Sequence, residues 1–233
     1  MGIFYLSKKI QFLPVIHGSA CFTHITRDRL LSSSTDCLAV GLPPEFQTTV
    51  EDGINRLPQI TLCSQKESSG SYNYIPIDPC QPVIMGLRIA SQEGIPRRFI
   101  DYSCDSYKPR KINFPDSYAL RHMSYEKFCA TLLLSIKRPK TDTLHDKRAR
   151  WIAYQLHQLE MDFKNITVIC SVLDWPWIKE AYNERKPYDK IISPFDNPKI
   201  YGVEKETLFF ALAEFPYITY LNEIYRQQIK SDK

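Results

Sequence analysis

The sequence predicts an α/β fold in which a central, largely parallel sheet is flanked by helices and followed by a C-terminal helical extension. Apolar runs of strand length alternate along the chain with segments of helical periodicity, as in repeating α/β units. Residues 165–172 form a nearly continuous apolar and β-branched run, which indicates a central strand buried on both faces. Pro82 and Gly94 bracket a helix that leads into the next strand through a short gap, which fits a crossover to a parallel neighbour.

The other elements follow from the same two periodicities. Strands are expected at the short apolar runs 12–16, 37–40, 59–63, 97–102 and 165–172. Helices are expected where apolar residues recur about once per turn, at 26–31, 50–57, 82–93, 125–136, 141–163 and 178–183. Segment 65–72 is polar and rich in serine, and segment 105–115 is rich in Pro, Lys and Tyr, so both are predicted to be loops.

Beyond Pro187 the pattern changes. Residues 188–201 are predicted to be irregular, and residues 204–214 and 217–228 to form two amphipathic helices separated at Pro216. The chain therefore divides into an α/β domain over residues 1–187 and a C-terminal helical extension over residues 188–233 that packs on it. We expect the last helix to pack on the sheet, or to meet a protein partner or a further domain.

The composition excludes several classes of protein. Hydrophobic residues make up 43% of the 233, which is enough for a core and excludes global disorder. The net charge is only +4 and its basic residues are spread out, so we expect no nucleic-acid partner. No segment has the apolar length of a membrane span, and Lys8 and Lys9 interrupt the N-terminal apolar stretch, so we expect a cytoplasmic protein with no membrane partner. The seven cysteines include no CxxC pair, which favours free thiols that act as small hydrophobes.

Common catalytic and nucleotide-binding motifs are missing from the sequence. It contains no GxGxxG or GxxxxGK[ST] phosphate loop, no GxSxG elbow and no HExxH zinc motif. Candidate site residues must therefore come from their position relative to the predicted strands.

Three polar residues stand at the carboxyl ends of predicted strands, where ligands collect in open α/β sheets. His17 follows the first strand, with Ser19 close behind it, and Asp101 and Asp174 end or follow two later strands. A histidine there is suited to act as a base or a metal ligand, and carboxylates bind hard metals. We therefore name His17, Asp101 and Asp174 as catalytic candidates, and His17 and Asp174 as candidate ligands of a divalent metal.

Neighbouring residues are further pocket candidates, and each candidate also has a structural interpretation. Trp175 and Trp177 are placed either to wall a pocket or to seal the core. Arg148 and Arg150 on the long helix either face the sheet edge and bind an anion, or are solvated. The histidine and the aspartates are equally compatible with hydrogen bonds that cap turns.

Three stretches together resemble a known superfamily. They are VIHGSA at 15–20, the segment 76–101 with its helix, glycine turn and strand ending on Asp101, and RARWIA at 148–153 leading into strand 168–171 and Asp174. Their order and spacing resemble the superfamily of erythromycin esterases, ChaN-like haem-binding proteins and TraB/Tiki proteins, and its bacterial members in particular, over residues 12–183. The resemblance implies a largely parallel sheet and a site with a His after the first strand, a Glu after the second and a Gly-x-x-His near the last. In active relatives these residues support metal-dependent proteolysis or ester hydrolysis.

This chain departs from that pattern at two of the three positions. His17 occupies the first, but Gly41 stands where the Glu is expected, and Ser171 and Asp174 stand in place of the Gly and the His. Loss of the Glu removes a general base or a charged metal ligand. The resemblance thus implies a degenerate active site and a non-catalytic binding or interaction domain, a pseudoenzyme. The alternative is a metal-assisted hydrolase, a peptidase or esterase, that uses His17, Asp101 and Asp174.

Overall fold

A four-stranded parallel sheet forms the centre of the molecule. The computed structural model describes residues 4–105, 107, 110, 112–189 and 197–231, with side chains up to residue 226. The strands lie in the order β1-β6-β2-β5, and all of their pairings are parallel. Their bounds are β1 Ile10–Val15, β6 Ile166–Ser171, β2 Cys37–Val40 and β5 Arg97–Phe99. The predicted fold class and the predicted central position of the 165–172 strand are therefore confirmed.

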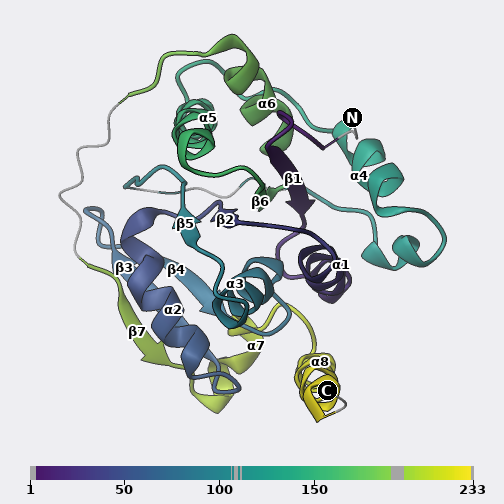
Figure 1. Ribbon diagram of the computed structural model, residues 1–233. Helices are drawn as coiled ribbons and strands as arrows, with labels where there is room; N and C mark the ends of the chain where they lie inside the picture. The colour runs from purple at the N-terminus through teal and green to yellow at the C-terminus, as the bar shows by residue number, and fades with distance from the viewer. Residues whose placement is uncertain (1–3, 106, 108–109, 111, 190–196, 232–233) are drawn as a thin grey trace.

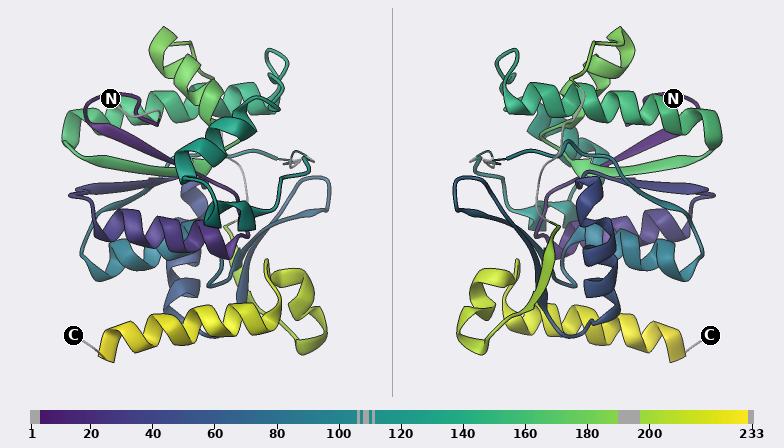
Figure 2. Two further views of the ribbon diagram at one scale, coloured as in Figure 1. Left: turned by 90° about the vertical axis from the view of Figure 1, so that its right-hand side faces the viewer. Right: turned by 90° about the vertical axis from the view of Figure 1, so that its left-hand side faces the viewer.

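Helices cover both faces of this sheet (Figure 1). On one side lie α1 (Ala20–Leu31) and α3 (Pro82–Gln92), which pack against each other. On the other side lie α5 (Leu144–Asp162) and α6 (Trp175–Glu184), which also pack together. The two views in Figure 2 show these helices as layers above and below the strands. The shorter α4 (Tyr125–Leu133) reaches α1 through Phe22 and Phe128, whose ring centroids are 5.9 Å apart.

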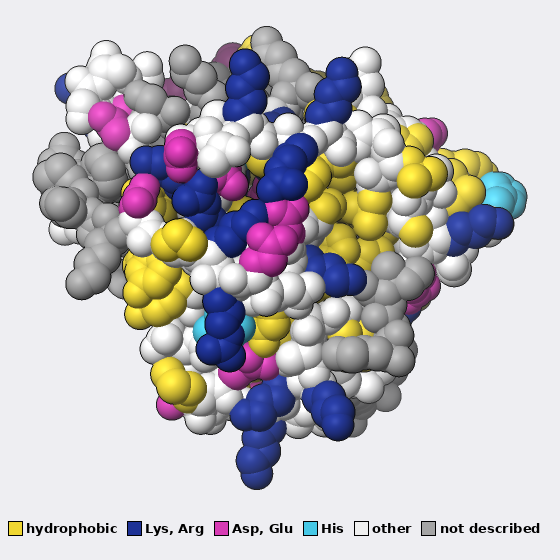
Figure 3. All heavy atoms as spheres, turned by 90° about the horizontal axis from the view of Figure 1, so that it is seen from above, with side chains coloured by type: hydrophobic (Ala, Val, Ile, Leu, Met, Phe, Trp, Pro, Cys, Tyr) yellow, Lys and Arg dark blue, Asp and Glu magenta, His cyan; other side chains and the backbone are white. Residues whose placement is uncertain are grey.

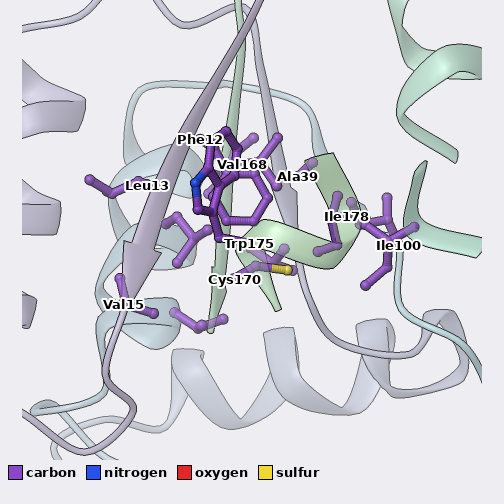
Figure 4. Packing of buried hydrophobic residues seen from close by; sticks show 14 of the residues in the cluster. Phe12, Leu13, Val15, Ala39, Ile100, Val168, Cys170, Trp175 and Ile178 are labelled. Atoms are coloured by element: carbon purple, nitrogen blue, oxygen red, sulfur yellow. The ribbon is translucent and has the colours of Figure 1, made fainter. Parts of the chain in front are cut away.

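The core between the sheet and α6 is built from aromatic and branched side chains (Figure 4). Trp175, the first residue of α6, is almost fully buried, and its ring centroid lies 4.7 Å from that of Phe12 on β1. Val168 on β6 and Ala39 on β2 are also inaccessible to solvent. Because both faces of β6 and β2 are buried, their sequences are apolar without alternation.

A second, antiparallel sheet was not expected from the sequence. Its strands lie in the order β4-β3-β7, with β3 at Thr61–Lys66, β4 at Tyr72–Ile77 and β7 at Lys199–Gly202. The helix α2 (Gln47–Asn55) packs on it so closely that a Cβ atom on Gly53 would lie 2.8 Å from Ile77 Cγ1. The predicted loop 65–72 is thus only the turn of a hairpin, because β3 extends to Lys66 and β4 begins at Tyr72.

The C-terminal region differs from the purely helical extension that we expected. Its first element is β7, which pairs with β3. The C-terminal region therefore contributes the third strand of the second sheet. The helix α7 (Leu208–Ala211) is a single turn, and α8 (Pro216–Ser231) begins at the proline that the sequence marked as a break. Short 3-10 turns occur at Pro44–Phe46, Ser117–Arg121 and Lys205–Thr207. The expected irregular segment 188–201 includes residues 190–196, which lie outside the described residues.

Hydrogen bonds and an ion pair fasten this region to the α/β layers. The buried carboxylate of Asp78 accepts a hydrogen bond from the Ala213 amide at 2.8 Å. Glu214 in turn accepts one from the Ala20 amide, at the start of α1, at 2.9 Å. Farther along, Arg88 of α3 donates two hydrogen bonds to Glu223 of α8, at 2.7 and 2.8 Å.

Other expectations about composition can be compared with the structure. All seven cysteines are free, and five of them are buried, as expected of small hydrophobes. Among the described helices, none combines the length and the apolar composition that a bilayer crossing requires. On the face seen from above in Figure 3, basic side chains are interspersed with acidic and apolar ones.

Candidate functional site

A cavity of about 370 Å³ opens at the carboxyl edge of the parallel sheet. His17, Gly41, Asp101 and Asp174 line it, and they follow β1, β2, β5 and β6 respectively. Because parallel strands end at one edge, four segments far apart in the sequence meet here. The β3–β4 hairpin forms another wall through Gln65, Asn73, Tyr74, Ile75 and Pro76. The structure therefore brings the three predicted catalytic candidates together in one cavity.

A buried ion pair occupies Asp101. Arg148, in the first turns of α5, donates from Nε to Asp101 Oδ1 at 3.0 Å and from Nη2 to Oδ2 at 2.5 Å. Both side chains are almost fully buried. Asp101 Oδ1 also accepts from the Tyr102 amide at 2.7 Å. The carboxylate at the end of β5 is thus saturated by a bidentate guanidinium and a backbone amide, the strongest arrangement for an Arg–carboxylate pair.

Asp174 is held by a second arginine. Arg110 Nη2 donates to Asp174 Oδ1 at 2.7 Å, while its Nη1 donates to the Leu173 carbonyl at 2.9 Å. Arg148 Nη2 lies 3.6 Å from Asp174 Oδ2, so it bridges the two aspartates. Burial lowers the pKa of the Arg148 guanidinium, but Asp101 and Asp174 outweigh this effect and hold that pKa well above its usual value. The anions that Arg148 binds at the sheet edge are therefore carboxylates of the protein itself.

Two histidines line the same cavity and are kept neutral. His17 stays accessible through the cavity, yet the protein atoms around it lower its pKa below 6.5 by desolvation, which the nearby Asp174 only partly offsets. Desolvation, followed by the charges of Arg110 and Arg148, likewise lowers the pKa of His145. The buried Nδ1 of His145 makes no hydrogen bond within the described structure. Both rings can therefore offer a neutral imidazole to a ligand near pH 7.

Gly41 faces the thiol of Cys170 across the cavity floor. A Cβ atom on Gly41 would overlap Cys170 Sγ, whereas the next closest atoms, Cβ and Cα of Cys170, lie at 3.5 and 3.6 Å. The resemblance assigns a Glu to this position. Cys170 fills the space in which the stem of such a side chain would begin. Burial, reinforced by Asp101 and Asp174, raises the pKa of the Cys170 thiol well above 9.0, so this sulfur stays protonated.

The rest of the wall is mainly apolar and aromatic. Leu42, Phe114 and Ile75 contribute to it, together with Tyr107, whose ring centroid lies 5.1 Å from the Arg148 guanidinium carbon. Burial raises the pKa of Tyr107, so its phenol remains uncharged. A cation over a ring face is stabilised by the ring quadrupole, which helps to hold Arg148 in place.

The remaining predicted pocket residues lie outside this cavity. Ser19 is buried beside α1 and donates to Ser117 Oγ at 3.1 Å. Arg150 is absent from the cavity wall and pairs with Asp142 and Asp146. Trp175 lies in the core against Phe12, because α6 turns its first residue under the sheet rather than towards the edge (Figure 4). Of the two alternatives for the tryptophans, sealing the core therefore holds for Trp175, and Trp177 is also absent from the cavity wall.

Metal binding by His17 and Asp174 meets a geometric objection. In the part of the chain that the structure describes, no group of three or more His, Cys, Asp or Glu side chains is arranged to hold a metal ion. Both arginines also lie within ion-pair distance of Asp174, at 2.7 and 3.6 Å. A divalent cation at this carboxylate would have to displace or repel them.

Several site residues were missed by the sequence analysis. Arg110 lies in segment 105–115, predicted to be a surface loop, of which residues 106, 108–109 and 111 are outside the description. His145 lies near the start of the predicted helix 141–163 and was not a site candidate, and Ile75 belongs to a hairpin that was not predicted. The sequence gives one signal of these residues, which is Arg148 in the same helix as His145, because one of its two predicted positions is at the sheet edge.

Comparison with sequence profiles of known families, with curated proteins and with solved structures found no match to this chain.

Proposed function

We propose that this chain is a non-catalytic binding domain that holds a small uncharged organic molecule at the carboxyl edge of its sheet. We place it as a divergent member of the erythromycin esterase, ChaN and TraB/Tiki superfamily with a degenerate active site. The observation that carries the proposal is the engagement of both cavity aspartates by arginines, Asp101 by Arg148 and Asp174 by Arg110.

This pairing removes the groups that hydrolysis would need. A general base must aim a free lone pair at the proton that it accepts, and the carboxylates of Asp101 and Asp174 are already directed at guanidinium groups. A metal ion that activates a nucleophile must be held by free carboxylate oxygens. Here the guanidinium of Arg148 lies against Asp101, and that of Arg110 lies against Asp174. At the third position, Gly41 offers no side chain, and Cys170 occupies the space beside it.

The charge balance of the cavity defines the class of ligand. Arg148 and Arg110 are matched by Asp101 and Asp174, and a third carboxylate of the wall, Glu45, accepts a hydrogen bond from the Ser103 hydroxyl. The cavity therefore has no excess of positive charge, and the depressed histidine pKa values leave both imidazoles neutral near pH 7. An anionic ligand would therefore compete with the protein's own carboxylates for the arginines. A neutral ligand would instead use the apolar wall and hydrogen-bond the imidazoles. The volume of about 370 Å³ lies within the range of small-molecule sites.

Two dyes with one skeleton test this proposal. N-phenyl-1-naphthylamine is neutral, and 1-anilinonaphthalene-8-sulfonate adds a sulfonate to the same arylamine. We expect the neutral dye to bind one site at least about tenfold more tightly, a difference of about 1.4 kcal/mol. Ile75→Trp, which fills the cavity wall, should abolish this binding, whereas Tyr220→Lys on the distant α8 should not. The proposal is contradicted if Ile75→Trp binds the neutral dye as tightly as the wild type does, or if the anionic dye binds more tightly than the neutral one.

A second candidate function is the metal-assisted hydrolase. It is favoured by one observation, which is that His17, Asp101 and Asp174 all line a single cavity. The assay is hydrolysis of p-nitrophenyl acetate and of a casein substrate with Mn²⁺, Zn²⁺, Co²⁺ or Ni²⁺, beside thermal shift with each metal. Turnover that disappears in His17→Ala but survives in the matched surface variant His122→Ala would replace the binding proposal by this one.

A further inference from the structure

An aromatic surface lies on α7, on α8 and on the turn between them. Its large side chains are 42 to 85% exposed, namely Phe209, Phe210, Phe215, Tyr217, Tyr220, Leu221 and Tyr225. On α8, the residues 217, 220, 221 and 225 follow helical spacing and form one stripe along the helix. Figure 2 shows α8 at the lower edge of the molecule, beyond the layer of α1 and α3. This set of seven residues is called the α7–α8 aromatic surface below.

The helix α8 buries polar side chains and exposes aromatic ones, which is the reverse of an ordinary surface helix. Its inner side contacts the protein through polar groups, since Thr219 and Glu223 are buried and Glu223 pairs with Arg88. Its outer side carries the aromatic stripe, whose last member, Tyr225, also meets the ring of His24 on α1 at a centroid distance of 6.4 Å. An amphipathic surface helix normally buries its apolar face and exposes its polar one, so this arrangement indicates that the outer face is itself covered in the working protein.

The charged side chains of α8 and of the segment before it, back to α7, all contact other groups of the protein. Residues 208–226 contain three charged side chains, Glu214, Glu223 and Arg226. Glu214 accepts from the Ala20 amide, Glu223 binds Arg88, and Arg226 lies 3.9 Å from Glu223 and is largely buried. The α7–α8 aromatic surface therefore contains no charge that would repel an identical surface or select a charged partner.

Its area matches what a stable dimer needs. A fully exposed aromatic side chain offers about 150–250 Å². The six aromatic side chains of this surface are exposed by 55 to 85%, so together they offer roughly 800 Å² of accessible area to a partner. A specific interface buries about 800 Å² on each partner. We infer that the α7–α8 aromatic surface is the interface of a two-fold symmetric homodimer, in which α7 and α8 of one copy pack against α7 and α8 of a second copy. Such an interface places the same surface on both subunits, which suits an uncharged apolar surface.

Sedimentation velocity of the full chain tests the inference, with two variants that form a matched pair. Tyr220 on α8 and Tyr72 on β4 are exposed to the same degree, 58 and 59%, so Tyr→Lys at either position leaves the monomer fold undisturbed. At about 10 µM we expect the wild type to have a sedimentation mass of twice the 27.2 kDa of one chain. Tyr220→Lys should weaken self-association at least about a hundredfold, because two lysines are brought into a desolvated interface, whereas Tyr72→Lys should remain dimeric. Dilution of the wild type to monomer should increase amide exchange in α7 and α8.

Each other outcome overturns the inference. A wild type that remains at 27.2 kDa at about 100 µM would assign the surface to a different protein or a further domain. A dimer that survives Tyr220→Lys but is lost in Tyr72→Lys would move the interface to the second sheet. A dimer that both variants leave intact would exclude both surfaces. Thermal unfolding of each variant at a monomeric concentration verifies that the fold is retained.

Discussion

Gly41 and Cys170 share a single space at the end of neighbouring strands, because a Cβ atom on Gly41 would overlap the Cys170 sulfur. The absence of a side chain directly after β2 and the presence of a thiol on β6 therefore depend on each other. This relationship explains in physical terms why the position that the resemblance assigns to a Glu carries no side chain here.

A double-mutant cycle should reveal this coupling. Gly41→Ala alone should lower the free energy of unfolding by about 1–3 kcal/mol, because the added methyl overpacks a filled site. In Gly41→Ala with Cys170→Ala the sulfur is gone and the nearest remaining atoms lie at ordinary contact distance, so the new methyl should be accommodated. Urea unfolding of the wild type, both single variants and the double variant gives the coupling energy. Additive losses would mean that the two residues do not compete for the same space.

Arg148 should be among the most sensitive positions of the chain. Arg148→Ala leaves the buried Asp101 without its partner and should cost about 3–5 kcal/mol of unfolding free energy. Arg56→Ala is the control, because that arginine pairs with Asp52 in an exposed position and should change stability by no more than about 0.5 kcal/mol. Chemical denaturation of both variants makes the comparison. Equal losses would show that the pair with Asp101 is not desolvated.

The attachment of α8 should depend on Glu223. Glu223→Ala removes the acceptor of both Arg88 hydrogen bonds and leaves a buried guanidinium uncompensated. We expect α8 amides to exchange at least about tenfold faster, because the helix has few apolar contacts on its inner side to replace the pair. Exchange measured by mass spectrometry on peptides from α8 and from the central strand β6 separates local detachment from global unfolding. Asn222→Ala, on the neighbouring residue of α8, serves as the control.

Stability should fall as the pH drops below 6.5. Desolvation by the surrounding protein atoms lowers the pKa of both His17 and His145 from 6.5, so the unfolded chain binds protons at a pH where the folded chain does not. Their contribution is complete above pH 6.5 and decreases as the pH falls towards the folded-state pKa values. Urea midpoints at about pH 7.5 and about pH 5.5 should differ less in His17→Asn/His145→Asn than in the wild type. An unchanged difference in that variant, or an equal reduction in the exposed-residue control His122→Asn, would assign the pH dependence to other groups.

The central sheet could be predicted from the sequence because its strands are buried on both faces. Burial of this kind requires nearly continuous apolar or β-branched runs, and residues 37–40 and 166–170 have this composition. The second sheet lacks this signal. On β3 and β4, buried residues such as Cys63 and Ile77 alternate with polar or exposed ones such as Ser64 and Tyr74, and the serine-rich turn resembles a loop.

The fold class and the convergence of His17, Asp101 and Asp174 could be predicted from the residues alone, because parallel strands place their carboxyl ends at one edge. The partners of those three side chains could not be predicted, because they depend on how distant segments pack. Arg110 and Arg148 reach the aspartates from a loop and a helix distant in sequence, and nothing in local spacing encodes that approach. The direction in which α6 and α8 turn their faces was also decided by packing, which put Trp175 into the core and the tyrosines of α8 on the surface.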